Sequence, residues 1–273
     1  MTIKLSTDYT DLLKKICVNL CNLWKKKYTE NNLRTKMTFS QTIRLIPRLV
    51  KYNLKVIFAG KFVWFLLAAL GFFMFFMFQS AWNRSEINES LIYTLLVFPS
   101  LLLIFYPAVF GIQNDEDNRI LEILFGIPDY KYKVWGVRLL MIYVAVFFLI
   151  IVFAGIASIL MYPVNLFGMT AQLMFPVLFF GNLAFMFSTI TRSGNGTAVI
   201  LIIIVILALI LSDAPFMRRT FWNIMLNPYQ TPRNILPVIW ENTIIKNRIF
   251  LITGSLVWMM VGMLNLQKRE KFV

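Results

Sequence analysis

The chain alternates between long apolar runs and shorter polar intervals. A membrane-spanning helix needs about 20 apolar residues, with a usual range of about 17 to 25. Runs close to this length occur at residues 62–78, 91–112, 139–161, 169–190, 197–212 and 249–266. We therefore predict an all-α membrane protein with six transmembrane helices, whose membrane domain occupies residues 62–266.

The third and fourth predicted spans come from one unusually long uncharged stretch. No charged residue occurs between Arg138 and Arg192, a distance of 53 residues. This is far more than one crossing requires, so the chain has to turn back within it. The sequence at 162–168 contains Tyr-Pro, Asn and Gly, which favour a turn at that point. A second tight break is predicted at 191–196, TRSGNG.

Two longer polar intervals separate the spans. Residues 113–138 are acidic at the start and basic at the end, and 213–248 contain four prolines and several large aromatic residues. Hydrophobicity in 213–248 is too interrupted for a span, and aromatic side chains suit the head-group layer. We predict an outer helical segment of short helices at 213–248.

The residues before the first span divide into two parts. Residues 1–37 form a basic extension, predicted as a short amphipathic helix or a loosely ordered tail. Residues 38–61 are predicted to form an amphipathic interfacial helix, because four cations fall on one helical stripe opposite aliphatic side chains. Those cations are Arg44, Arg48, Lys51 and Lys55. After the last span, residues 267–273 form a short tail.

Composition supports the membrane assignment. Hydrophobic residues make up 59% of the chain and charged residues 15%, and the mean hydropathy is +0.69. The net charge of +14 would suggest nucleic acid for a soluble protein. In a membrane protein it indicates Lys and Arg retained on cytoplasmic segments. We predict the lipid bilayer as a partner and no nucleic acid.

The distribution of cations predicts the orientation. With six spans, 21 of the 27 Lys and Arg residues fall on the side of both termini and of residues 113–138, and six on the other side. The side richer in Lys and Arg is the cytoplasmic one. Both termini and the 113–138 interval are therefore predicted to be cytoplasmic.

Catalytic chemistry is not indicated in this chain. It has no histidine, and its two cysteines, Cys17 and Cys21, are too few for a zinc site. All Asp and Glu lie outside the predicted spans, which disfavours a proton-coupled secondary transporter. The Gly60-Lys61 pair lacks the upstream glycine of a phosphate-binding loop. We predict no enzyme activity, no metal and no cofactor in this chain.

A short cytoplasmic helix is predicted just after the second span. Residues 115–125 begin with acids, which suit a helix N-terminus, and Gly126 and Pro128 end the helix. Ile120, Leu121 and Leu124 lie on one side, next to Phe125. An exposed apolar face of this kind is expected to dock on a partner, or to pack on the ends of this chain's own spans.

At these residues the chain resembles ABC-2 type transporter permeases. The pattern is Glu116-x5-Glu122-Ile-Leu-Phe-Gly-Ile-Pro128, followed by Gly136-Val-Arg138 and a long span. Residues 121–124, Leu-Glu-Ile-Leu, and Pro128 match the family motif, while Arg119-Ile120 stands where Gly-Thr is usual. The order of spans and the interfacial helix extend the resemblance over about residues 40–270.

The resemblance implies the permease half of an ABC exporter in a bacterial cytoplasmic membrane. Two six-span subunits would pair, as a homodimer or with a second permease. Each would bind a separate ABC ATP-binding subunit that holds ATP and Mg²⁺. The coupling helix, 115–128, would contact that ATPase, and its contact residues would be Glu116, Asp117, Arg119, Leu121, Glu122, Leu124, Phe125 and Pro128. The second and fifth spans would flank the transport pathway.

The composition of the spans indicates the class of cargo. Uncharged spans rich in Phe and Met suit export of a hydrophobic or amphipathic substrate. The 14 methionines are scattered through the spans, which indicates packing and not a metal pathway. The alternative is a membrane anchor or scaffold for an ATPase-linked secretion, motility or metal-site assembly complex.

Overall fold

The computed structural model describes residues 62–82, 87–117, 135–191, 193–232 and 235–269. Over these residues it contains helices and turns and no strand. The helices are α3 (Phe62–Trp82), α4 (Glu89–Asp117), α6 (Val137–Leu160), α7 (Leu166–Thr191), α8 (Gly194–Ser212) and α9 (Pro237–Arg269).

All six helices are long and apolar enough to cross a membrane. The shortest, α8, has 19 residues and the longest, α9, has 33. At 1.5 Å per residue these are about 28 and 50 Å long, against a hydrocarbon core of about 30 Å. A helix satisfies its backbone hydrogen bonds internally, as hydrocarbon surroundings require. The six predicted spans are thus confirmed as six candidate membrane-spanning helices.

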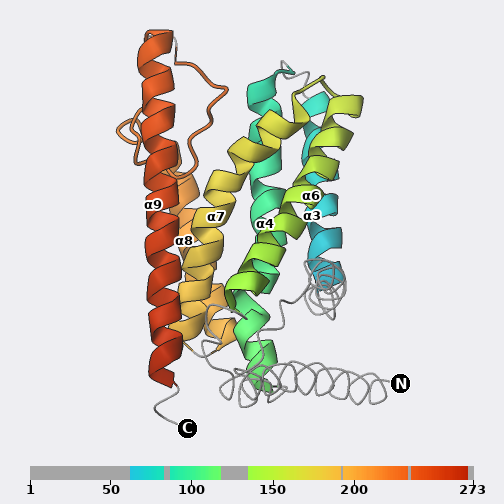
Figure 1. Ribbon diagram of the computed structural model, residues 1–273. Coiled ribbons are helices and arrows are strands. Elements are labelled where there is room, and N and C mark those ends of the chain that lie inside the picture. The colour runs from blue at the N-terminus through green and yellow to red at the C-terminus, as the bar shows by residue number, and fades with distance from the viewer. Residues whose placement is uncertain (1–61, 83–86, 118–134, 192, 233–234, 270–273) are drawn as a thin grey trace, which may run out of the picture.

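Successive helices run in opposite directions through one bundle (Figure 1). The turns of residues 213–232 lie at the upper end of Figure 1, together with the starts of α4, α7 and α9. The α7–α8 turn and the ends of α4 and α9 lie at the lower end. We use "upper end" and "lower end" in this sense below.

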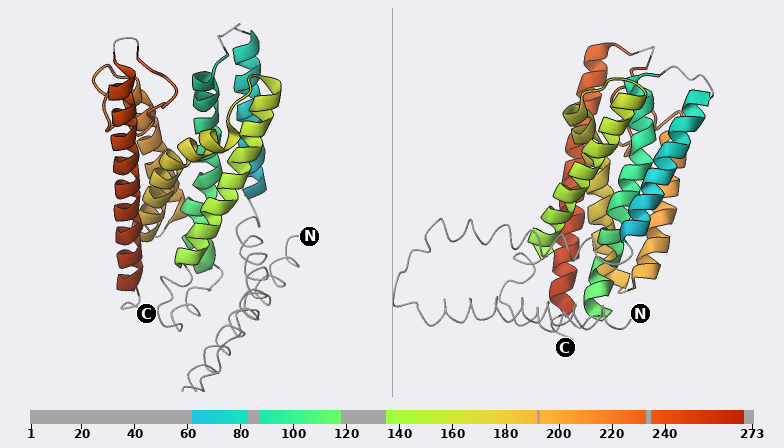
Figure 2. Two further views of the ribbon diagram at one scale, coloured as in Figure 1. Left: turned by 45° about the horizontal axis from the view of Figure 1, so that its top comes forward. Right: turned by 90° about the vertical axis from the view of Figure 1, so that its right-hand side faces the viewer.

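Helices α4 and α7 form the interior of the bundle. In the most apolar part of each, 72% of the residues are buried, compared with 22% in α3 and 17% in α8. Helix α7 contacts α4, α6, α8 and α9, and it crosses from α6 at the upper end toward α8 and α9 at the lower end (Figures 1 and 2). The prolines inside helices, Pro99, Pro107 and Pro176, all belong to this pair among the described spans.

The last helix differs from the prediction. Helix α9 begins at Pro237, twelve residues before the expected start at Ile249, and residues 213–232 form turns and not short helices. Proline is well suited to the first position of a helix, where no N–H is needed. Polar residues such as Glu241 and Lys246 interrupt the hydrophobic pattern here. The pattern therefore does not predict a helix before Ile249.

The second span also extends further than predicted. Helix α4 continues through Asp115 and Glu116 to Asp117, so the first residues of the predicted coupling helix belong to the same helix as the span. The remainder of that prediction, residues 118–128, lies outside the described residues. The basic extension 1–37, the interfacial helix 38–61 and most of the 267–273 tail lie outside them as well.

Candidate functional site

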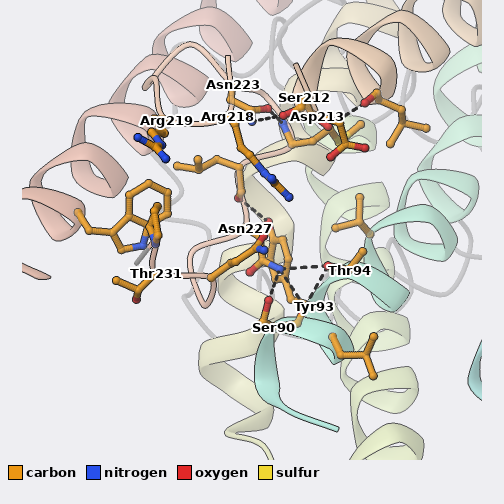
Figure 3. Close-up of a pocket in the computed structure, with 18 of the residues that line it drawn as sticks. Ser90, Tyr93, Thr94, Ser212, Asp213, Arg218, Arg219, Asn223, Asn227 and Thr231 are labelled. Carbon is orange, nitrogen blue, oxygen red and sulfur yellow. Dashed lines mark hydrogen bonds between the residues drawn. The ribbon is translucent and has the colours of Figure 1, made fainter. Parts of the chain in front are cut away.

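A cavity of about 780 Å³ opens at the upper end of the bundle. It lies between the start of α4, the end of α8 and the turns that follow α8 (Figure 3). In Figure 3 the two arginines and Asp213 lie on one side, and Ser90 and Thr94 of α4 lie on the other. The polar lining consists of Asn88, Ser90, Tyr93, Thr94, Ser212, Asp213, Arg218, Arg219, Asn223, Asn227, Gln230 and Thr231.

Three asparagines hold the turns of this cavity against the helices. Asn227 Nδ2 donates to the Ser90 carbonyl oxygen at 2.9 Å and to Thr94 Oγ1 at 3.1 Å. Asn247 Nδ2, on α9, donates to the carbonyl oxygens of Phe221 and Asn223, both at 2.8 Å. Asn223 Nδ2 donates to the Ser212 carbonyl oxygen at 3.3 Å. The segment is therefore fixed to α4, α8 and α9 although it contains no regular helix.

These asparagines are not among the site residues predicted from the sequence. A signal was present for one of them, because Asn227-Pro228 favours a turn and Asn side chains hydrogen-bond to the backbone two residues on. The structure has this bond, from Tyr229 N to Asn227 Oδ1 at 3.0 Å. The contact with Ser90 joins residues 137 positions apart, and no local pattern predicts that.

Arg248 is a buried cation close to this cavity. Its side chain is 6% exposed, and Nε donates to Gln172 Oε1 on α7 at 2.8 Å. Nη1 donates to Asn247 Oδ1 at 3.1 Å, and the guanidinium carbon lies 5.0 Å from the centre of the Phe175 ring. These three partners, Gln172, Asn247 and Phe175, are all neutral. The positive charge of Arg248 is therefore stabilised by hydrogen bonds and by a cation–π contact. The sequence had placed Arg248 in the outer interval, whereas it is buried within α9.

Two tyrosines, Tyr93 and Tyr229, lie close to Arg248 at this end. The Tyr93 and Tyr229 ring centres are 5.8 Å apart, and Tyr93 Oη donates to the Leu226 carbonyl oxygen at 3.4 Å. Burial raises the pKa of Tyr229, the negative charges of Glu89 and of Tyr93 when ionised raise it further, and Arg248 opposes them. Tyr229 therefore remains a neutral phenol throughout the ordinary pH range.

A second, apolar cavity of about 390 Å³ lies deeper in the bundle. Its described lining is apolar throughout and comes from α3, α4, α7 and α8: Phe65, Phe72, Phe98, Leu101, Leu102, Ile104, Phe105, Phe180, Gly181, Ala184, Leu201, Ile202, Val205, Ile206 and Leu209. Phe98 and Leu209 line both cavities. The two cavities therefore adjoin at these two side chains, and we call the pair the joined cavity, with a polar upper part and an apolar lower part.

At the lower end, α4 holds the start of α8. Gln113 Oε1, on α4, accepts a hydrogen bond from Gly194 N at 2.6 Å. A Cβ atom at position 194 would collide with Gln113 Oε1 and with the Phe110 ring. Ser188 Oγ on α7 donates to the Val109 carbonyl oxygen at 3.0 Å. Helix α4 thus holds Gly194 of the predicted 191–196 turn, and a larger residue at position 194 would displace the Gln113 and Phe110 side chains.

Polar side chains also connect α6, α7 and α9 inside the bundle. Tyr143 Oη donates to Asn182 Oδ1 at 2.7 Å, and Asn182 Nδ2 donates to Ser255 Oγ at 2.6 Å. Ser255 Oγ donates in turn to the Leu178 carbonyl oxygen at 3.2 Å. Each member has a partner, and none is an acid, so this network has the chemistry of a structural tie between helices.

The charged residues of the helices lie mainly toward their ends. Glu89 is exposed in the first turn of α4, and Glu241 is exposed near the start of α9. Arg138 is buried near the start of α6, with its guanidinium carbon 5.1 Å from the Trp135 ring centre. Within the described ranges, no three His, Cys, Asp or Glu side chains come together as a metal site requires.

Most of the predicted site residues lie outside the described residues. Glu116 and Asp117 are the last two residues of α4. The other predicted coupling residues, and the four interfacial cations, lie outside the described residues: Arg119, Leu121, Glu122, Leu124, Phe125, Pro128, Arg44, Arg48, Lys51 and Lys55. Their roles stay predictions.

Comparison of the chain with protein-family models, with curated proteins and with solved structures found no match.

Proposed function

We propose that this chain is the permease subunit of an ATP-driven transporter of the ABC-2 type, which exports a hydrophobic or amphipathic substrate. A separate ATP-binding subunit supplies the energy and docks on residues 115–128. The permease works in a bacterial cytoplasmic membrane as a pair, either with a second copy or with a different permease. The support comes from the residues of the resemblance together with the geometry of α4.

Helix α4 is the observation that carries the proposal. Its upper part contributes Tyr93 and Phe98 to the joined cavity, and its lower part holds α8 through Gln113. With 29 residues, α4 is about 44 Å long, which exceeds a hydrocarbon core of about 30 Å. One continuous helix thus connects the cavity to the start of the predicted docking segment.

This connection provides a route for mechanical coupling. A buried helix packed on its neighbours moves as a unit, because a packed interior does not deform continuously. A force applied by an ATPase at the end of α4 would therefore reach the cavity wall directly, and would reach α8 through the Gln113–Gly194 contact. In the proposed orientation the lower end is cytoplasmic, so the ATPase and the polar part of the cavity lie on opposite sides of the membrane.

The docking proposal is tested by capture of the ATPase. The chain is co-purified with a co-expressed candidate ATP-binding subunit, once as the wild type and once as the Leu121→Asp/Leu124→Asp variant. We expect the variant to lose co-purified ATPase activity, since two carboxylates on the apolar face oppose docking. Tyr132→Asp, in the same polar interval but outside 115–128, is the matched control and should retain the activity. Unchanged capture and turnover in the double variant would exclude this docking site.

Transport is separated from scaffolding by reconstitution. The complete complex is placed in vesicles, and ATP hydrolysis is measured with and without amphipathic compounds. A permease is stimulated by its cargo and moves it across the bilayer, whereas a scaffold hydrolyses ATP at the same rate with every compound.

A further inference from the structure

The joined cavity changes from polar at the upper end of the bundle to apolar further down. Its upper part is lined by hydroxyl, amide and charged side chains, and its lower part by Phe, Leu, Ile, Val, Ala and Gly. Phe98 and Leu209 lie at the junction. A molecule that fills both parts must be polar at one end and hydrocarbon at the other.

The apolar part has the dimensions of a chain within one leaflet. On α8 its lining runs from Leu201 to Leu209, which is about 12 Å along the helix axis. Half of a hydrocarbon core of about 30 Å is about 15 Å. Its volume of about 390 Å³ is within the range of small-ligand pockets, about 300 to 1,000 Å³. The right-hand view of Figure 2 shows α3 and α8 on the same side of the bundle.

The polar part carries a net positive charge. Of its described lining residues, Arg218, Arg219 and Asp213 are charged, and neither arginine forms an ion pair with a described acid. Arg248, which is 6% exposed, adds a buried positive charge close to Tyr93 and Tyr229. Glu89, which opposes this field, is exposed and does not line the cavity.

We propose that the joined cavity binds a membrane lipid with an anionic phosphate head group. The phosphate lies against Arg218 and Arg219, and one acyl chain lies in the apolar part. Guanidinium groups bind phosphate through paired, charge-assisted hydrogen bonds, and the Ser90 hydroxyl, which accepts a hydrogen bond from Asn227 Nδ2, supplies a further polar contact to the head group. The proposal rests on the proposed function for the lipid's role as cargo, but binding itself requires no ATPase.

The test measures binding of three probes to the purified full chain in detergent, without ATPase or nucleotide. Palmitoyl lysophosphatidic acid has both the phosphate and the chain, monopalmitoylglycerol lacks the phosphate, and glycerol 3-phosphate lacks the chain. We expect the first to bind about tenfold or more tightly than either of the others. Equal affinity of lysophosphatidic acid and monopalmitoylglycerol would overturn the head-group assignment. Equal affinity of lysophosphatidic acid and glycerol 3-phosphate would overturn the chain assignment.

Substitutions then locate the binding within the cavity. Arg218→Gln/Arg219→Gln should reduce lysophosphatidic acid binding about tenfold, to the level of monopalmitoylglycerol. Val205→Trp fills the apolar part and should weaken both chain-bearing probes. The controls are Lys246→Gln, an exposed cation outside the lining, and Val199→Trp, an exposed position of α8 outside the lining. Wild-type affinity in the arginine variant overturns the proposal.

The experiments distinguish failure of the lipid proposal from failure of the proposed permease function. A chain that binds no lipid but captures the ATPase through Leu121 and Leu124 retains the coupling function and loses this ligand. A chain that binds the anionic lipid but captures no ATPase retains the lipid site and loses the ABC assignment. If the substituted chains do not fold, the comparison of three probes on the wild-type chain still decides the question.

Discussion

Helices α4 and α7 contrast with α3 and α8, although all four are apolar and long enough to cross a membrane. The first pair is buried on most sides and contains the prolines, while the second pair is buried along a narrow strip. Helix α4 contacts both α3 and α8, and all four helices line the apolar part of the joined cavity. The inner pair therefore determines the architecture, and the outer pair forms walls that can be displaced with fewer lost contacts.

The contrast teaches that hydrophobicity alone does not identify the core of a membrane protein. Lipid tails are as apolar as leucine, so an exposed span and a buried span have similar composition. Packing distinguishes them instead, through close contacts, small residues and hydrogen-bonded side chains. Positions matched in residue type between the two pairs should therefore respond differently to the same substitution.

The largest difference is expected for truncation of a phenylalanine. Phe185 on α7 is 1% exposed, whereas Phe75 on α3 is 61% exposed. Phe185→Ala leaves a void beside Trp135 and Gly262 and should destabilise the protein by about 3 kcal/mol. Phe75→Ala should have little effect, because lipid fills the space. Thermal unfolding of both variants in the same detergent measures the difference, and equal losses would refute the division into inner and outer helices.

A smaller effect is expected when glycine is replaced by leucine. A Cβ at Gly181 on α7 would lie 2.9 Å from Ile104 Cγ1 and from Tyr143 Oη, while a Cβ at Gly71 on α3 meets nothing within 4 Å. Gly181→Leu should therefore destabilise the fold by about 2 kcal/mol through overpacking. Gly71→Leu should be neutral or slightly stabilising, because leucine favours a helix more than glycine does. The thermal midpoints report this order, and a reversed order would mean that α3 is covered on this face.

The smallest effect is expected in the pH dependence of stability. It arises from Tyr229, which lies in the upper turns and packs against Tyr93 of α4. The folded-state pKa of Tyr229 is raised above the ordinary value of 10.0, first by burial. The unfolded chain therefore loses this proton first, so the stabilisation is complete below about pH 10 and is lost as the pH rises toward the folded-state pKa. Wild-type stability should fall more between pH 9.5 and about 11 than that of Tyr229→Phe. Parallel profiles of stability against pH for the two proteins would show that the Tyr229 phenol does not contribute to the pH dependence of stability.

The sequence predicted the helices better than it predicted the site. Six long apolar runs, the uncharged stretch after Arg138 and the turn residues at 162–168 are local signals, and helices satisfy their own backbone hydrogen bonds, so these predictions need no tertiary information. The structure begins α7 at Leu166, with Asn165 Oδ1 accepting from Gly168 N at 3.1 Å.

The joined cavity could not be predicted in the same way. It depends on pairs such as Asn227 with Ser90 and Asn247 with Phe221, which are far apart along the chain. Arg248 also appeared to belong to a surface interval, because nearby Glu241 and Lys246 obscured the apolar pattern. Its burial follows from Gln172 and Phe175 on α7, whose proximity only the folded chain reveals.

Helix α9 gives the molecule a fixed frame of reference. It is one uninterrupted helix of 33 residues, about 50 Å long. Asn247 ties it to the upper turns, and close packing of Gly262 against Phe185 ties it to α7 toward the lower end. Spectroscopic labels at its two ends therefore stay at a constant separation, so any change in distance from them to α3 or α8 reports movement of those helices.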